Sequence, residues 1–220
     1  MSKMMTLIGL AGLVVVGLVV FRFTQTSSSG SAFKEEMEEW SALELQKWHE
    51  FTSPSHHFKV LMPTLPQHAK EKINDPTTKE ARAYDMYVSL KDNGSVFMIS
   101  LISLLDNPAK TLDPSMLSNV VDNMVSGSPN SKVKKMEMGK YKEYPSIDFS
   151  FENPDANVDG KAFIVGNTLI LLTGVAKPSD YNQKEFDFFV NSFQLTPRET
   201  NEKEDILEAS EKGVEPKTAP

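Results

Sequence analysis

The sequence predicts an α+β fold: an antiparallel β-sheet meander covered by helices on both faces (an α/β/α sandwich), preceded by an N-terminal transmembrane helix. Three observations lead to this prediction. Residues 4–21 carry no charged side chain. Between residues 57 and 176 short segments of alternating apolar residues are separated by turn residues. One amphipathic helical pattern lies within that series of strands and a second follows its last strand. This order differs from the alternation of strands and helices in a doubly wound nucleotide-binding fold.

The composition narrows the class of protein. The chain has 220 residues, a net charge of −7 and no cysteine. This length allows one domain with accessory segments. An acidic chain with scattered lysines does not predict a nucleic-acid partner, which needs clustered positive charge. The missing cysteines exclude disulfides, thiol catalysis, cysteine-ligated metals and a lipid-bearing cysteine.

Residues 1–23 are predicted to be a transmembrane anchor. The uncharged run 4–21, bounded by Lys3 and Arg22, gives about 27 Å of helix, close to the thickness of the hydrocarbon core. A cleaved signal peptide is the alternative, but the small residues at 30–32 lie far beyond the apolar run. Positive charges nearly balance across the helix, so orientation is weakly specified. We expect a single-pass membrane protein with its domain on the non-cytoplasmic side.

Residues 24–32 are mainly Ser, Thr and Gly and are predicted to be a flexible linker. Residues 33–52 are predicted to form an amphipathic helix, because large apolar side chains recur at helical spacing. These side chains are Phe33, Met37, Trp40, Trp48 and Phe51. The first turns are acidic, which disfavours a lipid surface. Packing on the chain's own domain is the preferred interpretation, and a partner-binding or self-association helix and a lipid-surface helix are the alternatives.

The folded domain is predicted over residues 53–197. Its first strand begins near residue 57 and stops at Pro63, and a polar loop follows. Residues 80–90 alternate as a second strand, and the sequence Asp-Asn-Gly at 92–94 indicates a hairpin. The third strand, residues 95–105, is apolar on both faces and is therefore expected at the centre of the sheet, covered on both sides.

A helix is predicted at residues 112–127, with Asp113 as N-cap and Pro114 at the first helical position. Four strands are expected after it, at residues 132–139, 145–152, 159–166 and 168–176. The last two are expected to be joined by a hairpin at 165–168.

Residues 180–195 are predicted to form the closing helix, with Phe186, Phe189, Val190 and Phe193 facing inward and Pro197 ending it. Residues 198–220 are acidic and nearly free of large apolar side chains, which predicts a disordered tail.

Several motifs of the predicted domain resemble the PsbP-like α/β-sandwich family. They are F-x-V-x-M-P at 58–63, Y-x-x-Y-P-S-I-D-F at 141–149, GKAFIVGNTLILLTGVAK at 160–177 and F-F-x-N-S-F-Q-L at 188–195. The family includes the extrinsic PsbP subunit of photosystem II and a eukaryotic Ran-binding relative. The resemblance covers about residues 57–196 and implies a non-catalytic protein that binds partners or stabilises complexes beside a membrane. It carries over no binding or catalytic residue.

The sequence nominates no catalytic, cofactor-binding or metal-binding residue. The histidines are His49, His56, His57 and His68. Adjacent histidines on a strand point to opposite faces and do not readily share one metal. The pair at 56–57 is therefore interpreted as the polar entrance of the first strand. No nucleophile elbow or phosphate-binding loop is present.

Two carboxylate pairs have the residue types for acid–base chemistry, Asp148 with Glu152 and Asp155 with Asp159. Beside strands and turns they are interpreted as solvated. Gly160 and Gly166 are interpreted as turn residues. The aromatic residues Tyr141 and Tyr144 are expected at core or edge positions, with a binding surface as the alternative.

Together these observations predict a membrane-tethered, non-enzymatic interaction domain that assists the assembly or stability of a membrane or envelope complex. The membrane contact would be residues 4–21, and the partner would be a protein of unknown identity. A small-ligand or lipid-binding domain is the alternative, because helices packed over a sheet can enclose a pocket. An unrecognised hydrolase is the third possibility, and no cofactor is expected.

Overall fold

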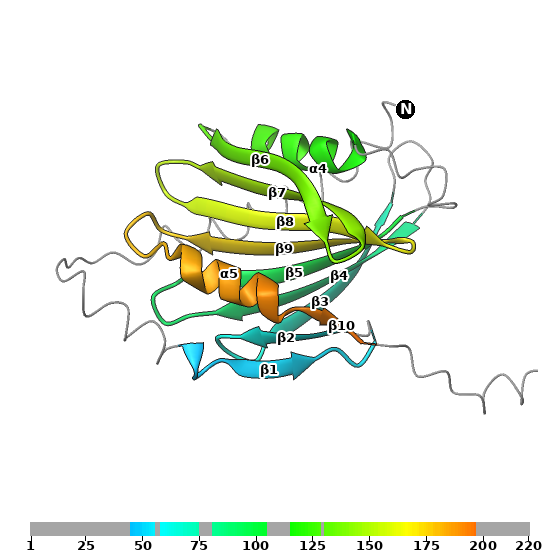
Figure 1. The fold of residues 1–220 in the computed structure, drawn as a ribbon, viewed down its shortest axis with the longest axis horizontal. Helices are drawn as coiled ribbons and strands as arrows, with labels where there is room; N and C mark the ends of the chain where they lie inside the picture. Colours follow the sequence, from blue (N-terminus) through cyan, green and yellow to red (C-terminus); the bar gives the residue numbers. More distant parts are fainter. Residues whose placement is uncertain (1–44, 56–57, 75–80, 105–114, 129, 197–220) are drawn as a thin grey trace, which may run out of the picture.

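The computed structural model describes residues 45–55, 58–74, 81–104, 115–128 and 130–196 (Figure 1). Within these ranges no helix is long and apolar enough to cross a membrane. The predicted anchor at 4–21, the linker at 24–32, most of the predicted helix at 33–52 and the tail at 198–220 lie outside the described residues.

The described chain forms two antiparallel sheets. The large sheet has seven strands in the order β3-β4-β5-β9-β8-β7-β6. Their bounds are β3 (Gln67–Asn74), β4 (Ala81–Leu90), β5 (Val96–Ser103), β9 (Thr168–Ala176), β8 (Asn157–Val165), β7 (Tyr144–Glu152) and β6 (Lys132–Tyr141). The small sheet has the order β1-β2-β10, with β1 (His49–Thr52), β2 (Phe58–Met62) and β10 (Gln194–Leu195). Strand β5 is central and buried on both faces, as predicted.

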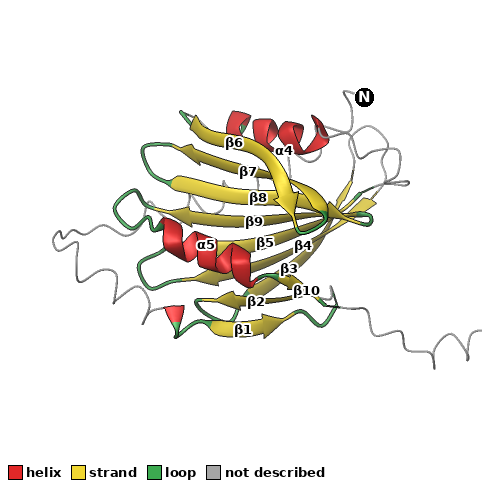
Figure 2. Cartoon of the chain, in the orientation of Figure 1, coloured by secondary structure: helices red, strands yellow, loops and turns green. Residues whose placement is uncertain are grey.

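Two helices lie on opposite faces of the large sheet, α4 (Ser115–Ser126) and α5 (Gln183–Ser192) (Figure 2). The α4-side core contains Leu117, Val121, Ile147, Phe149 and Phe151, among others. The α5-side core contains Phe58, Phe97, Phe163, Phe189 and Phe193, among others. The α+β prediction is thus confirmed. The α/β/α description needs a correction, because α5 shares its layer with the small sheet.

The predicted helix at 33–52 is wrong at its end, since residues 49–52 form strand β1. Trp48 and Phe51 fit helical spacing in the sequence, but the backbone pairs with β2, where Phe51 lies opposite Val60. Both aromatic side chains still pack on the domain. Trp48 contacts Phe97 at a centroid distance of 4.9 Å, and Phe51 contacts Tyr87 at 5.3 Å.

Strand β3 replaces part of the polar loop predicted after Pro63. Its sequence, QHAKEKIN, has no apolar alternation, and its described side chains are mostly exposed. All of β3 pairs with residues 81–88 of β4, and this pairing supplies its backbone hydrogen bonds, so the strand needs no buried face of its own.

The closing helix ends at Ser192 and not near Pro197, because Phe193 has an extended backbone and leads into β10. The Ser192 hydroxyl accepts from Leu61 N at 3.0 Å and donates to Phe189 O at 2.7 Å, which ties the end of α5 to β2. Phe193 remains inward-facing and is buried in the α5-side core, as expected.

Gly166 lies in the predicted hairpin with φ +56°, but Gly160 is in the middle of β8, so its interpretation as a turn residue is wrong. Gly160 is paired with Phe149 on β7. A Cβ at this position would lie 1.9 Å from Phe149 Cζ, so the ring occupies the space that a side chain would fill. Glycine is required here by close packing.

Candidate functional site

A groove of about 580 Å³ lies beside α5 on the face of the sheet that carries the small sheet. Figure 1 shows α5 crossing β9 and β5, while β8, β7 and β6 continue the sheet beyond the helix. The strands contribute Lys134, Lys135, Asp148, Phe149, Ser150, Asp159, Gly160 and Lys161. The helix contributes Gln183, Phe186, Asp187, Val190 and Asn191.

Strand alternation makes the floor of this groove polar. Phe149 and Val158 point into the α4-side core, so their neighbours along β7 and β8 point to the α5 side. Directly opposite one another across the two strands lie Asp148 with Lys161, and Ser150 with Asp159. The register of one strand pair therefore places two acidic and two other polar residues on a single surface.

Each lysine of the groove is paired with a carboxylate. Lys161 forms an ion pair with Asp148. Lys134 Nζ lies 3.1 Å from Glu152, and Lys135 Nζ lies 3.3 Å from Glu137. These contacts neutralise the positive charge of the floor within the chain itself.

Asp159 differs from Asp148 and Asp187, the other carboxylates that line the groove, because it is only 5% exposed. Burial raises the pKa of its carboxyl group, whereas hydrogen bonds with Tyr181 and Ser150 lower it. The Asp187 carboxylate raises this pKa further, and Lys135 lowers it. Among the described residues Asp159 and Asp187 take part in no ion pair.

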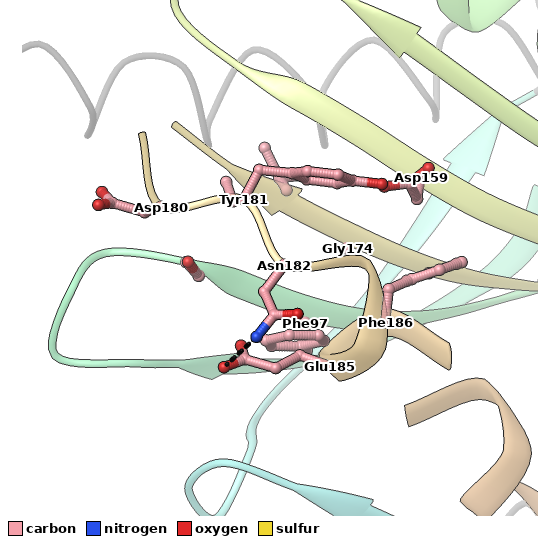
Figure 3. Close-up of a pocket in the computed structure, with 11 residues that line it drawn as sticks. Phe97, Asp159, Gly174, Asp180, Tyr181, Asn182, Glu185 and Phe186 are labelled. Carbon is pink, nitrogen blue, oxygen red and sulfur yellow. Dashed lines mark hydrogen bonds between the residues drawn. The ribbon is translucent and has the colours of Figure 1, made fainter. Parts of the chain in front are cut away.

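The first turn of α5 forms the wall nearest to Asp159. Asn182 is the N-cap and accepts from Lys184 N at 3.1 Å. Figure 3 shows the Tyr181 ring extending from the preceding loop toward Asp159. The Tyr181 hydroxyl also donates to Gln183, whose amide donates to Asp187 at 3.0 Å. Burial, followed by the contact with Asp159, raises the pKa of Tyr181.

A small cavity of about 20 Å³ lies on the other side of this turn, enough for about one water molecule. It is lined by Ser95 and Phe97 of the β5 side and by Asp159, Tyr181 and Phe186, among others (Figure 3). Asp159 and Phe186 line both the cavity and the groove, so the two hollows meet at these side chains.

The structure places His49 and His68, the two histidines among the described residues, in separate surroundings. His49 lies on exposed β1, and His68 Nε2 on β3 is hydrogen-bonded to Asp85 at 2.8 Å. His56 and His57 lie outside the described residues, so their interpretation stays a prediction. In the part of the chain that the structure describes, no group of three or more His, Cys, Asp or Glu side chains is placed to hold a metal.

The carboxylate pairs named from the sequence are also separate. Asp148 and Glu152 lie on one face of β7, but each is paired with a different lysine. Asp155 is exposed in the turn before β8. Asp159, predicted to be solvated, is instead buried. The sequence signal that could have found it is its place within β8, between Val158 and Gly160 on the opposite face.

Tyr141 and Tyr144 occupy a core position and a partly buried position, in agreement with the expectation of core or edge positions. Tyr141 is buried, stacks on Phe163 at 4.3 Å and donates to Phe193 O. Burial raises the pKa of Tyr141 to about 12. Tyr144 is partly buried against the same core.

Comparison with known proteins gives a likeness of structure only. No family model matches the sequence, and no curated protein matches it. Among solved structures the chain is similar to cyanobacterial PsbP (CyanoP) from Synechocystis sp. PCC 6803, with 10% identity and a TM-score of 0.45. The match covers 78% of this chain and 99% of the other.

Proposed function

We propose that this chain is a membrane-tethered, non-enzymatic interaction domain that binds a protein partner through the groove beside α5. Through that contact it would assist the assembly or stability of a membrane or envelope complex. Residues 4–21 would hold it in the membrane, with the domain on the non-cytoplasmic side.

The observation that carries this proposal is the open, polar floor of the groove. A volume of about 580 Å³ is within the range of binding pockets, and the groove lies on a rigid sheet beside a capped helix. Its exposed rim on α5 is formed by Gln183, Asp187 and Asn191, spaced at four residues along one helical face. Such a surface suits an extended polar segment better than a lipid chain, which favours an apolar lining.

The arrangement of the charges supports binding over catalysis. Acid–base chemistry needs two titratable groups that converge on one reacting atom. Here Asp148 is neutralised by Lys161, and Asp159 is hydrogen-bonded to Tyr181 and Ser150. These contacts fix a charge pattern, which is what a docking surface needs.

A site-specific crosslink tests the proposal. A benzophenone side chain is placed at Asn191, on the rim of the groove, in the full chain expressed in its native membranes. The matched control is Asp122, an exposed position of α4 on the opposite face of the sheet. We expect one discrete protein adduct from position 191 and none from position 122. Equal labelling from both positions, or no adduct from position 191, would overturn the proposal.

A further inference from the structure

The groove beside α5 has an unbalanced charge at one end. Its three lysines are all paired with carboxylates of the same chain. Asp159 and Asp187 take part in no ion pair among the described residues. Asp187 lies near enough to raise the pKa of Asp159, and Lys135, whose ion pair is with Glu137, lies near enough to lower it. The end of the groove at the first turn of α5 is therefore negative, although its floor as a whole is balanced.

Asp159 has unused capacity to accept hydrogen bonds. An ionised carboxylate offers about four acceptor sites. Its partners here are Ser150 and Tyr181, and the single proton of the Tyr181 hydroxyl is also directed to Gln183. A ligand that brings several N–H donors would satisfy the remaining sites.

A second acceptor is buried next to it. Ser95 is 3% exposed, and its Oγ has no hydrogen-bond partner among the described residues. Its neighbour Val96 packs in the α4-side core, so strand alternation directs Ser95 to the α5 side. There it lines the small cavity together with Asp159. Buried hydroxyl groups are usually hydrogen-bonded, so the Ser95 hydroxyl is available to a donor or acceptor that reaches this cavity.

The shape of the two hollows limits what this group can be. The cavity holds about 20 Å³, whereas the groove holds about 580 Å³, and Phe186 lines both. A single terminal nitrogen of a cationic side chain is about the size of a water molecule and would fit the cavity, while the rest of the side chain would lie in the groove against Phe186 and Val190. A bare metal ion fits less well, because the described residues contain no group of three or more metal-ligating side chains.

We propose that the groove receives an extended segment of the partner protein and that a lysine or arginine side chain of that segment pairs with Asp159. Asp187 adds to the attraction from the rim, and Ser95 accepts a further hydrogen bond inside the cavity. This inference rests on the proposed function, since it assigns the partner's chemistry at the same groove.

Short peptides test the inference without knowledge of the partner. The full chain, solubilised in detergent, is titrated with blocked pentapeptides that carry arginine, lysine or glutamine between alanines. Binding is followed by backbone amide chemical shifts. We expect saturable shifts at Ser150, Gly160 and Tyr181 with the arginine and lysine peptides. The glutamine peptide should bind at least about tenfold more weakly, because it has no charge to pair with Asp159.

Three variants complete the test. Asp159→Asn keeps the shape of the side chain and should weaken binding of the arginine peptide at least about tenfold. Asp187→Asn, at an exposed position on α5, should weaken binding of the arginine peptide severalfold. Asp155→Asn removes an exposed carboxylate outside the groove and should change nothing.

Equal binding of the glutamine peptide would overturn the inference, as would unchanged affinity in both groove variants or shifts centred elsewhere on the domain. A specific adduct from position 191 without binding of basic peptides would refute the inference that the partner inserts a cationic side chain, but it would still support the proposed function. Basic peptides that bind at Asp159, with no adduct from position 191, would refute the proposed function instead.

Discussion

Among the described residues, Asp159 is a carboxyl group that folding buries without a direct ion pair, and Lys135 is the one cation that lowers its pKa. Burial is the largest influence on the pKa of Asp159 and raises it, so the ionised form is less stable in the folded chain than in the unfolded chain. A folded state that holds its proton more tightly loses stability as pH rises through the interval between the unfolded and folded pKa values. At neutral pH Asp159 therefore costs stability.

The variant Asp159→Asn is expected to raise the free energy of unfolding at pH 7, because it removes a buried charge and keeps the shape of the side chain. The gain should shrink as pH falls toward 3.8, the ordinary pKa of aspartate, where the native carboxyl group is also protonated. Urea unfolding at a series of pH values measures this difference. A variant less stable than the native chain at pH 7 would contradict the expectation, and Asp155→Asn provides the exposed control.

The individual residues of the site were only partly predictable. The alternation that identifies β8 also shows that Asp159 and Gly160 point to opposite faces. The sequence cannot show that Tyr181 returns to cover Asp159, because that contact depends on the loop before α5. Nor can it show that the Phe149 ring fills the space above Gly160, since this depends on the pairing of β7 with β8.

Helix α5 is held against the domain at both ends, which keeps the wall of the groove in place. At its start, Lys91 Nζ lies 2.7 Å from Glu185 Oε1, and both side chains are largely buried. At its end, the Ser192 hydroxyl bonds the backbone of β2. Between these contacts Phe186 packs on Gly174, where a Cβ would lie 2.8 Å from the ring.

The variant Glu185→Gln should lower the free energy of unfolding by roughly 2–4 kcal/mol, because it leaves the Lys91 ammonium buried without its counter-ion. The double variant Lys91→Met with Glu185→Gln removes both charges and should recover most of the loss. Chemical denaturation of the three proteins gives the comparison. If the single variant is as stable as the native chain, the ion pair contributes nothing to holding α5.

Elements with strong periodicity were predicted well, and those that depend on distant pairing were not. Strands β4, β5, β7, β8 and β9 alternate or are apolar throughout, and their bounds agree within a few residues. Strand β3 is polar and exists because β4 pairs with it. Strand β10 has two residues, too few for any pattern. Before and within β1, Trp48 and Phe51 are three residues apart, which fits one face of a helix, and the extended backbone of β1 follows instead from its pairing with β2.

At the scale of the whole molecule, residues 4–21 would join the described domain to the membrane, and this anchor is a prediction from the sequence. Removal of residues 1–32 should release the domain into the soluble fraction after alkaline extraction of membranes. Val15→Arg should weaken insertion of the full chain by about 2.5–3.5 kcal/mol, whereas Val15→Leu should not. A full chain found in the soluble fraction would contradict the anchor. A mature N-terminus near residue 32 would instead indicate a cleaved signal.

The pairing within the small sheet affects when this part of the domain can fold during translation. Strand β2 is synthesised early, yet it pairs with β10, which is among the last described residues to leave the ribosome. Phe58 and Phe193 stack at 5.1 Å across that junction. Closing a contact between opposite ends of a chain is entropically costly and slow. A nascent chain therefore carries an uncovered apolar strand until translation is nearly complete, and this interval is when it would be most exposed to aggregation or to chaperones.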